Sequence, residues 1–387
     1  MKGEDKKLNR SAKEKSSLML AHQEALDVAG MGLASLSYND NTTDSSPCQS
    51  APAWLEDFEL DLKFTPKKLN SVELANSYSR IGWDNRSERV RDCGTRLEFA
   101  HEISPEGIVS DVGKLHSANF CKDRLCPMCA WRRTYKIFAQ VSQIMGVIGD
   151  KYKFLFLTLT VPNVTAQELS TAVDDLLKAW RKLMRYKRVS AVVQGFFRAL
   201  EITRNKDPKS KSFGTYHPHF HAVLAVPKSY GTGRSYIKHS EWLELWRKAC
   251  KDPTITQVDI RVARNKYDDN GTDSNVEGLA SAVAEIAKYP VKDADILVPG
   301  DNDQTDSIVQ TLANALSGRR LTAYGGCFDD AWKQLQLDDA EDGDLIHLNE
   351  KLNPAMAWLV VKYGWSCGVY KISGSYVKQP KDMEDET

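Results

Sequence analysis

The sequence predicts an α+β fold, in which an antiparallel sheet is flanked by helices. Segments rich in aromatic and β-branched residues, which favour strands, alternate with segments of helical pattern. Two strand segments, 195–205 and 215–226, are separated only by the polar turn KDPKSKSFG, and strand, polar loop, strand is typical of an antiparallel hairpin. Because helices and strands mix and a hairpin is present, helices are expected to pack on an antiparallel sheet.

The elements can be placed in order along the chain, beginning near Trp54. The strand KYKFLFLTLTV (151–161) ends at Pro162, and Thr165 opens the next helix, with Glu168 in the position of a capping box. The predicted elements are a helix at 126–148, a strand at 151–161, a helix at 165–187, strands at 195–205 and 215–226, a helix at 240–250, a strand at 255–264 and a helix at 274–290.

Four regions are expected along the chain. Residues 1–55 are rich in Lys, Ser, Asn, Thr and Asp, as disordered or linker segments are. Residues 56–148 hold a cysteine module and a basic helix, residues 149–300 hold the sheet, and residues 301–387 form a C-terminal extension with an acidic tail. No apolar run reaches the roughly 18 residues that a membrane span needs, so a cytoplasmic protein with no membrane contact is expected.

The net charge is zero, but the charge is unevenly distributed. Between Lys114 and Ser212 there are 19 Lys or Arg residues against 7 Asp or Glu. The last part of the chain is acidic, with Asp338, Asp339, Glu341, Asp342 and Asp344 followed by Asp382, Glu384, Asp385 and Glu386. A basic middle with an acidic end suits a phosphate-binding surface, although ordinary solvated charge gives the same pattern.

Three histidines alternate in the strand TYHPHFHAVLAV (215–226). Side chains of a strand repeat with period two, so His217, His219 and His221 point to one face and form a metal platform. His219 and His221 are the safer pair, because a proline follows His217 and loosens the pleat there. Glu201 on the neighbouring strand is the best candidate carboxylate, and such mixed ligands suit Mg²⁺ or Mn²⁺. A zinc hydrolase site, or a strand without a ligand, are the alternatives.

A glutamate and a tyrosine lie on one face of the predicted helix 274–290. Glu285 and Tyr289 are four residues apart and can reach the same substrate group. Attack by Tyr289 on a phosphodiester would form a phosphotyrosine bond, and Glu285 could act as a general base. Lys288 and Lys292 could neutralise phosphate charge. By itself the pair is more typical of a helix end that merely packs and hydrogen-bonds, and only the histidine strand favours a catalytic role.

Four of the eight cysteines form a candidate zinc site. Cys121, Cys126 and Cys129 read C-x4-C-x2-C, and Cys93 precedes them, joined to Cys121 by a long hairpin. A tetrahedral site with four thiolates would be structural, since no ligand position stays open. His116 could replace Cys93, and a set of small buried thiols is the alternative to a metal site.

Two arginines follow the last cysteines of this candidate site. Arg132 and Arg133 lie on the first turns of the helix 126–148. They would place positive charge beside the zinc unit, as a module that binds DNA phosphates needs.

Together these motifs resemble those of rolling-circle plasmid replication initiators of the HUH endonuclease superfamily, in the branch with one catalytic tyrosine and a glutamate. FLTLTVPN (156–163) is similar to the first motif of that family, HPHFHAVL (217–224) to its His-hydrophobic-His motif and EIAKYPVKDAD (285–295) to its tyrosine motif. The resemblance also includes CG at 93–94, FCKDRLCPMC at 120–129 and, more weakly, GRRLTAYGG at 318–326. It covers roughly residues 85 to 330.

The resemblance implies a fold and a mechanism. The fold would be an HUH-type central antiparallel sheet of about five strands, with the histidines on a middle strand and an N-terminal zinc-binding module. His219 and His221 would bind the divalent metal, and Tyr289 would form a 5′-phosphotyrosine link to plasmid origin DNA. Glu285 would take the place of a second tyrosine and promote the terminating cleavage and rejoining.

Two other functions remain open at this point. A transposase or a mobilisation relaxase uses the same chemistry, although the lone tyrosine with Glu285 favours the initiator. A non-catalytic zinc-dependent DNA-binding regulator would need the cysteines and the basic middle, but neither the histidines nor Tyr289. No G-x-x-x-x-G-K-[ST] motif for a helicase is present, so an initiator would need a host helicase.

Overall fold

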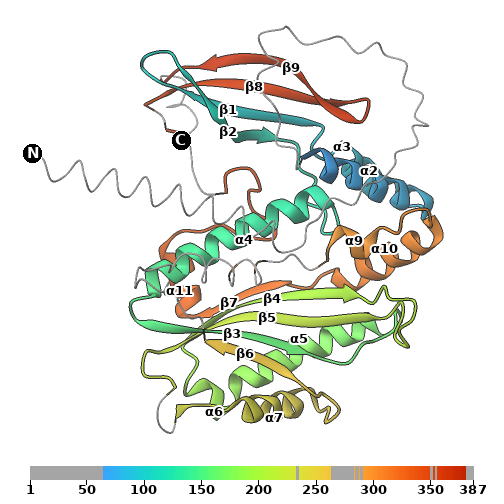
Figure 1. Ribbon diagram of the computed structural model, residues 1–387, viewed down its shortest axis with the longest axis vertical. Coiled ribbons are helices and arrows are strands. Elements are labelled where there is room, and N and C mark those ends of the chain that lie inside the picture. The colour runs from blue at the N-terminus through green and yellow to red at the C-terminus, as the bar shows by residue number, and fades with distance from the viewer. Residues whose placement is uncertain are drawn as a thin grey trace, which may run out of the picture. The chain divides into compact units, whose positions relative to one another are not determined.

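The computed structural model describes residues 64–231, 235–262, 283, 287, 291–348, 352–353 and 355–380. It confirms the α+β class, with two antiparallel sheets of five and four strands and helices around them (Figure 1). The chain divides into two compact units, and each sheet belongs to one of them. The chain passes between the units several times, once inside the long helix α4 (Pro127–Ile148), after Lys136. No helix among the described residues is long and apolar enough to cross a membrane.

The five-stranded sheet has the strand order β6-β3-β5-β4-β7, and every neighbouring pair is antiparallel. Its strands are β3 (Tyr152–Thr160), β4 (Gly195–Arg204), β5 (Tyr216–Pro227), β6 (Val258–Val262) and β7 (Thr322–Gly326). The first four correspond to predicted strands, and β4 and β5 form the predicted hairpin. Because β5 is the middle strand, side chains on it are flanked by β3 and β4.

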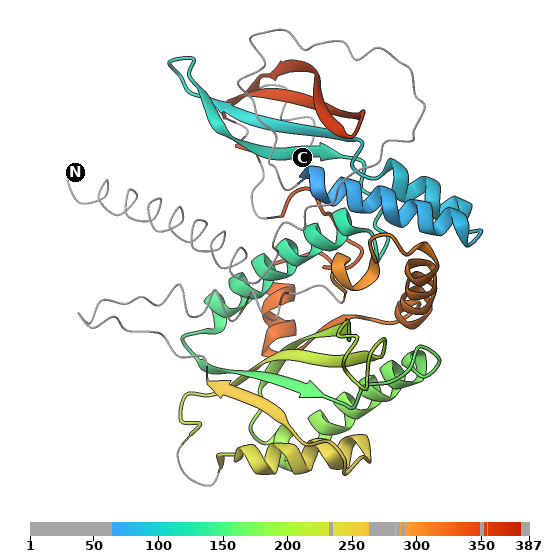
Figure 2. The same cartoon turned by 45° about the vertical axis from the view of Figure 1, so that its right-hand side comes forward.

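One face of this sheet is covered by helices. In α5 (Leu169–Arg185), the ring of Trp180 lies 5.6 Å from Phe220 of β5 and 5.1 Å from Phe196 of β4. Helix α7 (His239–Cys250) packs beside α5, and the short α6 (Lys187–Ser190) follows α5. Figure 2 shows α5 in green and α7 in yellow on the same side of the sheet. Phe220 alternates with the histidines along β5, so the histidines lie on the opposite face.

Helix α5 begins at Leu169, four residues after the predicted start at Thr165. The Glu168 carboxylate accepts hydrogen bonds from the backbone N–H and the hydroxyl of Thr165, at 2.9 and 2.7 Å. The bond from the Thr165 N–H is one half of a capping box, but the Thr165 hydroxyl donates instead of accepting, and the contacts close a turn that precedes the helix.

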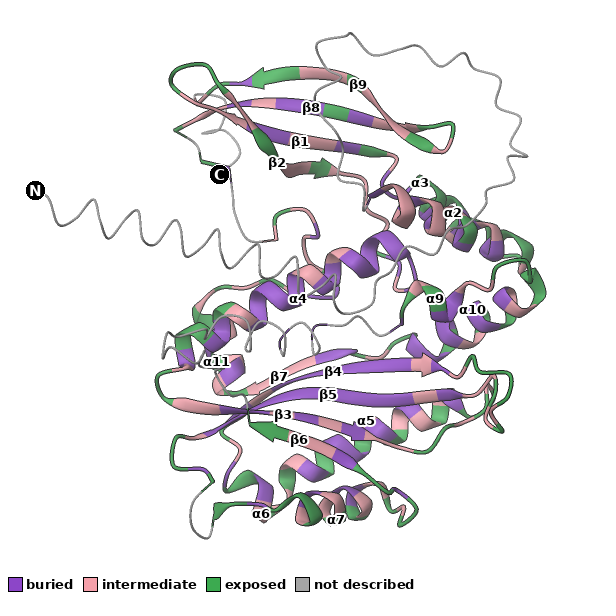
Figure 3. Cartoon of the chain, in the orientation of Figure 1, coloured by how far each residue is buried: buried purple, intermediate pink, exposed green. Residues whose placement is uncertain are grey.

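The face that carries the histidines is covered by α11 (Cys327–Gln334), which follows β7 directly. The ring of Phe328 lies 6.1 Å from Phe154 of β3. The junction of β7 and α11 approaches β4 closely, because a Cβ atom on Gly195 would lie 2.6 Å from the Cys327 Sγ and 2.8 Å from the Gly325 oxygen. Only glycine fits this contact. Figure 3 shows that β4 and β5 are buried along most of their length.

The four-stranded sheet was not predicted. It has the order β2-β1-β8-β9, from β1 (Arg96–Ile103), β2 (Val109–Ala118), β8 (Ala357–Ser366) and β9 (Val369–Lys378). The hairpin β1–β2 is the one expected between Cys93 and Cys121. A second hairpin from the end of the chain adds to it, because β8 pairs with β1 along the whole length of β1.

An aromatic core joins two helices of this second unit to its sheet. The helices of the unit are α2 (Phe64–Arg80), α3 (Asp84–Asp92), the first part of α4, α9 (Asp293–Ile296) and α10 (Asn302–Leu316), and the core involves α2 and α4. The ring of Phe64 lies 5.4 Å from Phe99 of β1 and 4.8 Å from Trp131 of α4. Phe99 also contacts Tyr363 of β8, at 5.8 Å. Burial of such large rings stabilises the sheet against α2 and α4.

Candidate functional site

The β4–β5 hairpin brings Glu201, His219 and His221 together. Glu201 pairs with His219 in the strand register, and His221 follows on the same face of β5. The Glu201 Oε2 lies 2.9 Å from the His221 Nε2 and 3.4 Å from the His219 Nε2, and the two Nε2 atoms are 3.2 Å apart. All three residues are less than 10% exposed. A carboxylate and two imidazoles therefore converge, with their ligand atoms turned toward one point.

These distances fit a metal ion. Ligands about 2.1 Å from a metal lie about 3.0 Å apart in neighbouring octahedral positions and about 3.4 Å apart in a tetrahedron. The observed 2.9 to 3.4 Å spans both values. Burial alone would raise the pKa of Glu201, but hydrogen bonds and positive charge from His219 and His221 outweigh it and hold that pKa below its ordinary value. The carboxylate is therefore in the ionised form that a metal requires.

The outward-facing nitrogens of both histidines are also engaged. The Nδ1 of His219 lies 3.0 Å from the backbone oxygen of His217, and the Nδ1 of His221 lies 3.2 Å from the Thr158 Oγ1. A hydrogen bond at Nδ1 fixes the ring and directs the Nε2 lone pair toward a metal. Thr158 lies in the segment FLTLTVPN, but sequence reasoning gave it no role, because its register opposite His221 arises only when β3 and β5 pair.

His217, the other candidate for the third ligand, lies beside this group. Its ring stacks on His219 with the centroids 5.1 Å apart. The ligand atoms that lie within 4.8 Å of one another belong to Glu201, His219 and His221. Burial, and then the neighbouring charge of His219, lower the pKa of His217. The geometry therefore brings Glu201, and not His217, to the two histidines.

The predicted tyrosine helix falls largely outside the described residues. The structure does not describe Tyr289, Glu285 or Lys288, so it gives no distance from them to the histidines. Lys292 is described and is exposed, immediately before the helix α9. The roles of these four residues stay predictions.

The four predicted cysteines form a second cluster, in the unit with the four-stranded sheet. The Sγ of Cys93 lies 3.5 Å from that of Cys129 and 3.6 Å from that of Cys126, and the Sγ atoms of Cys121 and Cys129 are 3.7 Å apart. These separations exclude disulfides, whose sulfurs are about 2.05 Å apart. Four thiolates about 2.3 Å from a tetrahedral zinc ion would be about 3.8 Å apart. The cluster therefore has the size of a four-cysteine zinc site.

Backbone N–H groups around the cysteines favour the ionised, thiolate form of their side chains. The backbone N–H of Cys121 points at the Cys93 Sγ, and that of Asp123 at the Cys121 Sγ, both at 3.4 Å. Such donors stabilise negative charge on sulfur. Gly94 follows Cys93 with a φ of +68°, in the left-handed region that favours glycine. His116, the predicted alternative to Cys93, is not among the clustered ligands.

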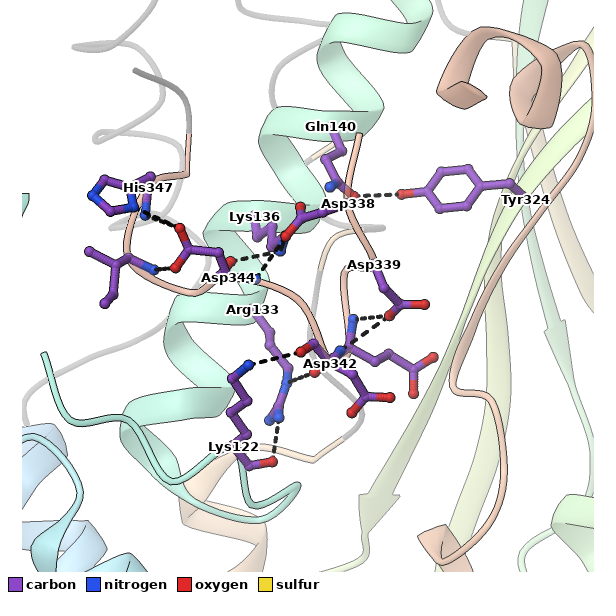
Figure 4. A network of polar contacts seen from close by, with 12 residues as sticks. Lys122, Arg133, Lys136, Gln140, Tyr324, Asp338, Asp339, Asp342, Asp344 and His347 are labelled. Carbon is purple, nitrogen blue, oxygen red and sulfur yellow. Dashed lines mark hydrogen bonds and ion pairs between the residues drawn. The ribbon is translucent and has the colours of Figure 1, made fainter. Parts of the chain in front are cut away.

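The two arginines predicted to bind DNA hold an acidic segment of their own unit. Arg133 is 1% exposed, and its guanidinium donates to the backbone oxygens of Glu341, Asp123 and Lys122. Arg132 donates to the backbone oxygens at positions 345 and 346. Figure 4 shows Arg133 reaching from α4 toward this segment. A role of either arginine in DNA binding stays a prediction.

Lys136, one turn further along α4, completes this network. Its ammonium donates to the Asp338 carboxylate and to the backbone oxygen of Asp344, both at 2.6 Å (Figure 4). Asp344 in turn accepts a 2.7 Å hydrogen bond from His347. Part of the acidic end predicted from the sequence thus neutralises the basic side of α4.

Comparisons with known proteins identify the family of the chain. Residues 112–370 match the family model described as "Replication protein". A "Protein rep" of Bacillus amyloliquefaciens is 42% identical over 303 residues, which is 74% of this chain and 85% of that protein. A "Protein rep" of a Bacillus species is 39% identical, with 78% and 97% of the two chains covered. One of Streptococcus pneumoniae is 36% identical, with 75% and 85% covered.

No solved structure matches the chain significantly. The family assignment therefore comes from the sequence comparisons. The match covers well over half of the chain and includes both the histidine strand and three of the four clustered cysteines. It agrees with the motifs that resembled replication initiators, and the chain belongs to the replication protein (Rep) family.

Proposed function

We propose that this protein initiates plasmid replication by nicking one strand of the double-strand origin. Membership of the replication protein family supports a role in initiation. The observation that supports a nicking enzyme is the buried convergence of Glu201, His219 and His221 on the middle strands of an antiparallel sheet. A protein that only binds DNA has no need of a buried carboxylate between two imidazoles, because burying charge costs free energy.

In this mechanism the three residues hold a divalent ion, Mg²⁺ or Mn²⁺. When bound, the ion polarises the scissile phosphate and neutralises charge that develops on it. Thr158 and the backbone oxygen of His217 keep the two imidazoles oriented. A zinc hydrolase site has the same ligands, but the family assignment to replication proteins favours a phosphodiester as substrate.

Tyr289 is the proposed nucleophile. Its phenolic oxygen loses its proton to solvent and attacks the phosphorus, the bond from phosphorus to the 3′-oxygen of the upstream strand breaks, and that oxygen takes up a proton from solvent. The downstream strand stays attached through a 5′-phosphotyrosine bond, which conserves the energy needed for rejoining. Lys288 and Lys292 would neutralise neighbouring phosphates. After one round, Glu285 would promote the second cleavage and the rejoining as a general base, and a host helicase would unwind the duplex.

The experiment that tests this proposal follows the two ends of a cleaved strand. A single-stranded origin oligonucleotide is incubated with the protein and Mn²⁺ and separated by denaturing electrophoresis. With a label at its 3′ end, the label should migrate with the protein. With a label at its 5′ end, a shorter free fragment should appear. A regulator without catalysis would leave both oligonucleotides intact. A relaxase or transposase would give the same fragments but would not support replication from the plasmid origin in cells.

A first prediction concerns Thr158, which we propose as a positioning residue for His221. Thr158→Val keeps the shape of the side chain but removes the hydroxyl 3.2 Å from the Nδ1 of His221. We expect the affinity for Mn²⁺ to fall about 10- to 100-fold, as when other partners of metal-binding histidines are lost. Titration calorimetry measures this directly.

The matched control is Thr160→Val, two residues along the same face of β3. The hydroxyl of Thr160 donates to the backbone oxygen of Gln257 and not to a ligand. Thr160→Val should therefore leave the affinity for Mn²⁺ unchanged. Equal Mn²⁺ affinities in the two variants would remove Thr158 from the site.

A second prediction concerns zinc, which we propose is held by the four clustered cysteines. The purified protein should contain about one zinc ion per chain. Cys126→Ser should lose this zinc and melt at a lower temperature, because the free energy of binding a structural metal is also folding free energy. Cys126 is fully buried in the cluster.

The control for this prediction is Cys367→Ser, in the turn between β8 and β9. Cys367 is exposed and lies in the same unit, but it is not one of the clustered cysteines. Cys367→Ser should keep the zinc and should melt at the temperature of the unmodified protein. Metal analysis that finds no zinc in protein purified without chelators would rule the zinc proposal out.

A further inference from the structure

We propose that the loop between β4 and β5 grips the unpaired DNA strand next to the Glu201–His219–His221 group. In this inference Lys209 and Lys211 neutralise phosphates and Phe213 stacks on a base. It rests on the proposed nicking function and adds the element that positions the strand.

The loop lies at the end of the hairpin where the three ligand residues are found. The last paired residues before it are Arg204 and Tyr216, three positions beyond the Glu201–His219 pair. At about 3.3 Å per residue, the loop begins about 10 Å from the ligands. A strand that is held at the histidines and runs along the hairpin toward the loop would reach it within a few nucleotides.

The loop is held in one conformation by side-chain hydrogen bonds. The Asn205 amide donates to the hydroxyls of Ser210 and Ser212, at 3.0 and 2.7 Å, and the Asp207 carboxylate accepts the backbone N–H of Lys209. The amide of Asn163, which ends the segment FLTLTVPN, donates to the Thr215 hydroxyl at 2.9 Å. A preordered loop loses less conformational entropy when it binds a ligand.

The outer side of the loop offers positive charge and an aromatic ring. Lys209 and Lys211 are exposed, and Phe213 is 46% exposed. The Arg204 guanidinium lies 5.9 Å from the ring of Phe213. The only acidic residue between Arg204 and Phe213 is Asp207, and its carboxylate is used in the loop itself. The ring and the three basic side chains thus lie together at one short loop.

This combination selects single-stranded DNA as the partner. Proteins that bind single strands combine cations that follow the backbone with aromatic rings on which bases stack. Duplex DNA would use the lysines but has no unstacked base to offer the ring. An ordinary solvated loop is the alternative, and the binding measurements below distinguish the two.

The test measures binding in a Tyr289→Phe background, so that no covalent product forms. A fluorescent single-stranded origin oligonucleotide is titrated and its anisotropy is followed at several KCl concentrations. The variants are Lys209→Ala with Lys211→Ala, Phe213→Ala and Phe213→Trp. The control is Lys151→Ala with Lys228→Ala, which removes two exposed lysines at the opposite end of the β3–β5 pair.

We expect the double lysine variant to lower the slope of log affinity against log salt by about 1.4, since each phosphate contact contributes about 0.7 on single strands. Phe213→Ala should weaken binding about 5- to 150-fold, the range found for loss of one stacked base, and Phe213→Trp should bind as the parent does. The control should change neither the slope nor the affinity at fixed salt.

A second measurement tests directly whether Phe213 stacks on a base. With 2-aminopurine at successive positions beside the nick site, one position should lose fluorescence on binding through stacking, and Phe213→Ala should restore it. If the unmodified protein nicks and the Tyr289→Phe parent binds, but the loop variants bind as the control does, this inference is overturned and the proposed function stands. If the unmodified protein neither binds nor nicks the origin strand, both are overturned.

Discussion

Glu201→Gln should abolish metal-dependent nicking while leaving the fold intact. The substitution keeps the size of a side chain that is 3% exposed and removes the charge that lies 2.9 and 3.4 Å from the two histidine nitrogens. A metal that polarises a phosphate is worth several kcal/mol in the transition state, so the rate of nicking should fall by at least about 100-fold. Nicking of a labelled origin oligonucleotide in Mg²⁺ and in Mn²⁺ measures the effect.

His219→Ala together with His221→Ala should have the same effect on nicking. Both rings are buried, so this variant also leaves a cavity and should melt at a lower temperature than Glu201→Gln. The matched control is His239→Gln, whose ring contacts the backbone oxygen of Val258 outside the group. Undiminished nicking by Glu201→Gln and by the double histidine variant would contradict the proposed site.

The second large effect is expected at Tyr289. Tyr289→Phe removes the nucleophilic oxygen, so no covalent adduct should be detected, while affinity for origin DNA should stay near that of the unmodified protein. Denaturing electrophoresis with a 3′-labelled strand detects the adduct, and anisotropy measures binding. Tyr236→Phe is the control, because Tyr236 is an exposed tyrosine of the same unit. An adduct formed by Tyr289→Phe would show that another residue is the nucleophile.

Glu285 should separate initiation from termination. The first nick needs the tyrosine and the metal but no activated water, so Glu285→Ala should still form the adduct. Loss of a general base costs about 100- to 10,000-fold in rate, so termination should be poor and multimeric single-stranded products should accumulate in cells. Glu285→Tyr should restore part of the termination. Failure of Glu285→Ala at the first nick would assign the residue to a different step.

The β4–β5 hairpin and its histidines show what a local sequence pattern can predict. The spacing of His217, His219 and His221 predicted one shared face, because side chains of a strand alternate strictly. The short polar turn predicted that β4 and β5 pair, and the structure confirms that they do. What the pattern left open was the third ligand. Glu201 reaches the histidines because the register places it opposite His219, and register depends on the whole turn and core.

The four-stranded sheet shows where local pattern fails. In the turn between β8 and β9, Cys367 and Gly368 both have positive φ, as tight hairpin turns require. Gly368 is typical of such a turn, but Cys367 is not, so the turn has only a weak signal in the sequence. The pairing of this hairpin with β1, more than 250 residues earlier, has no local signature.

The sequence by itself determined the α+β class, the strand that carries the histidines and the four cysteines of the second cluster. Periodicity and residue chemistry are local properties, so they can be read without the fold. Only the tertiary structure decided that Glu201 completes the histidine group, that Cys93 rather than His116 joins the cysteines, and that Arg133 is buried against the acidic segment. These are contacts between segments far apart in the chain, and they depend on packing and strand register that no single segment encodes.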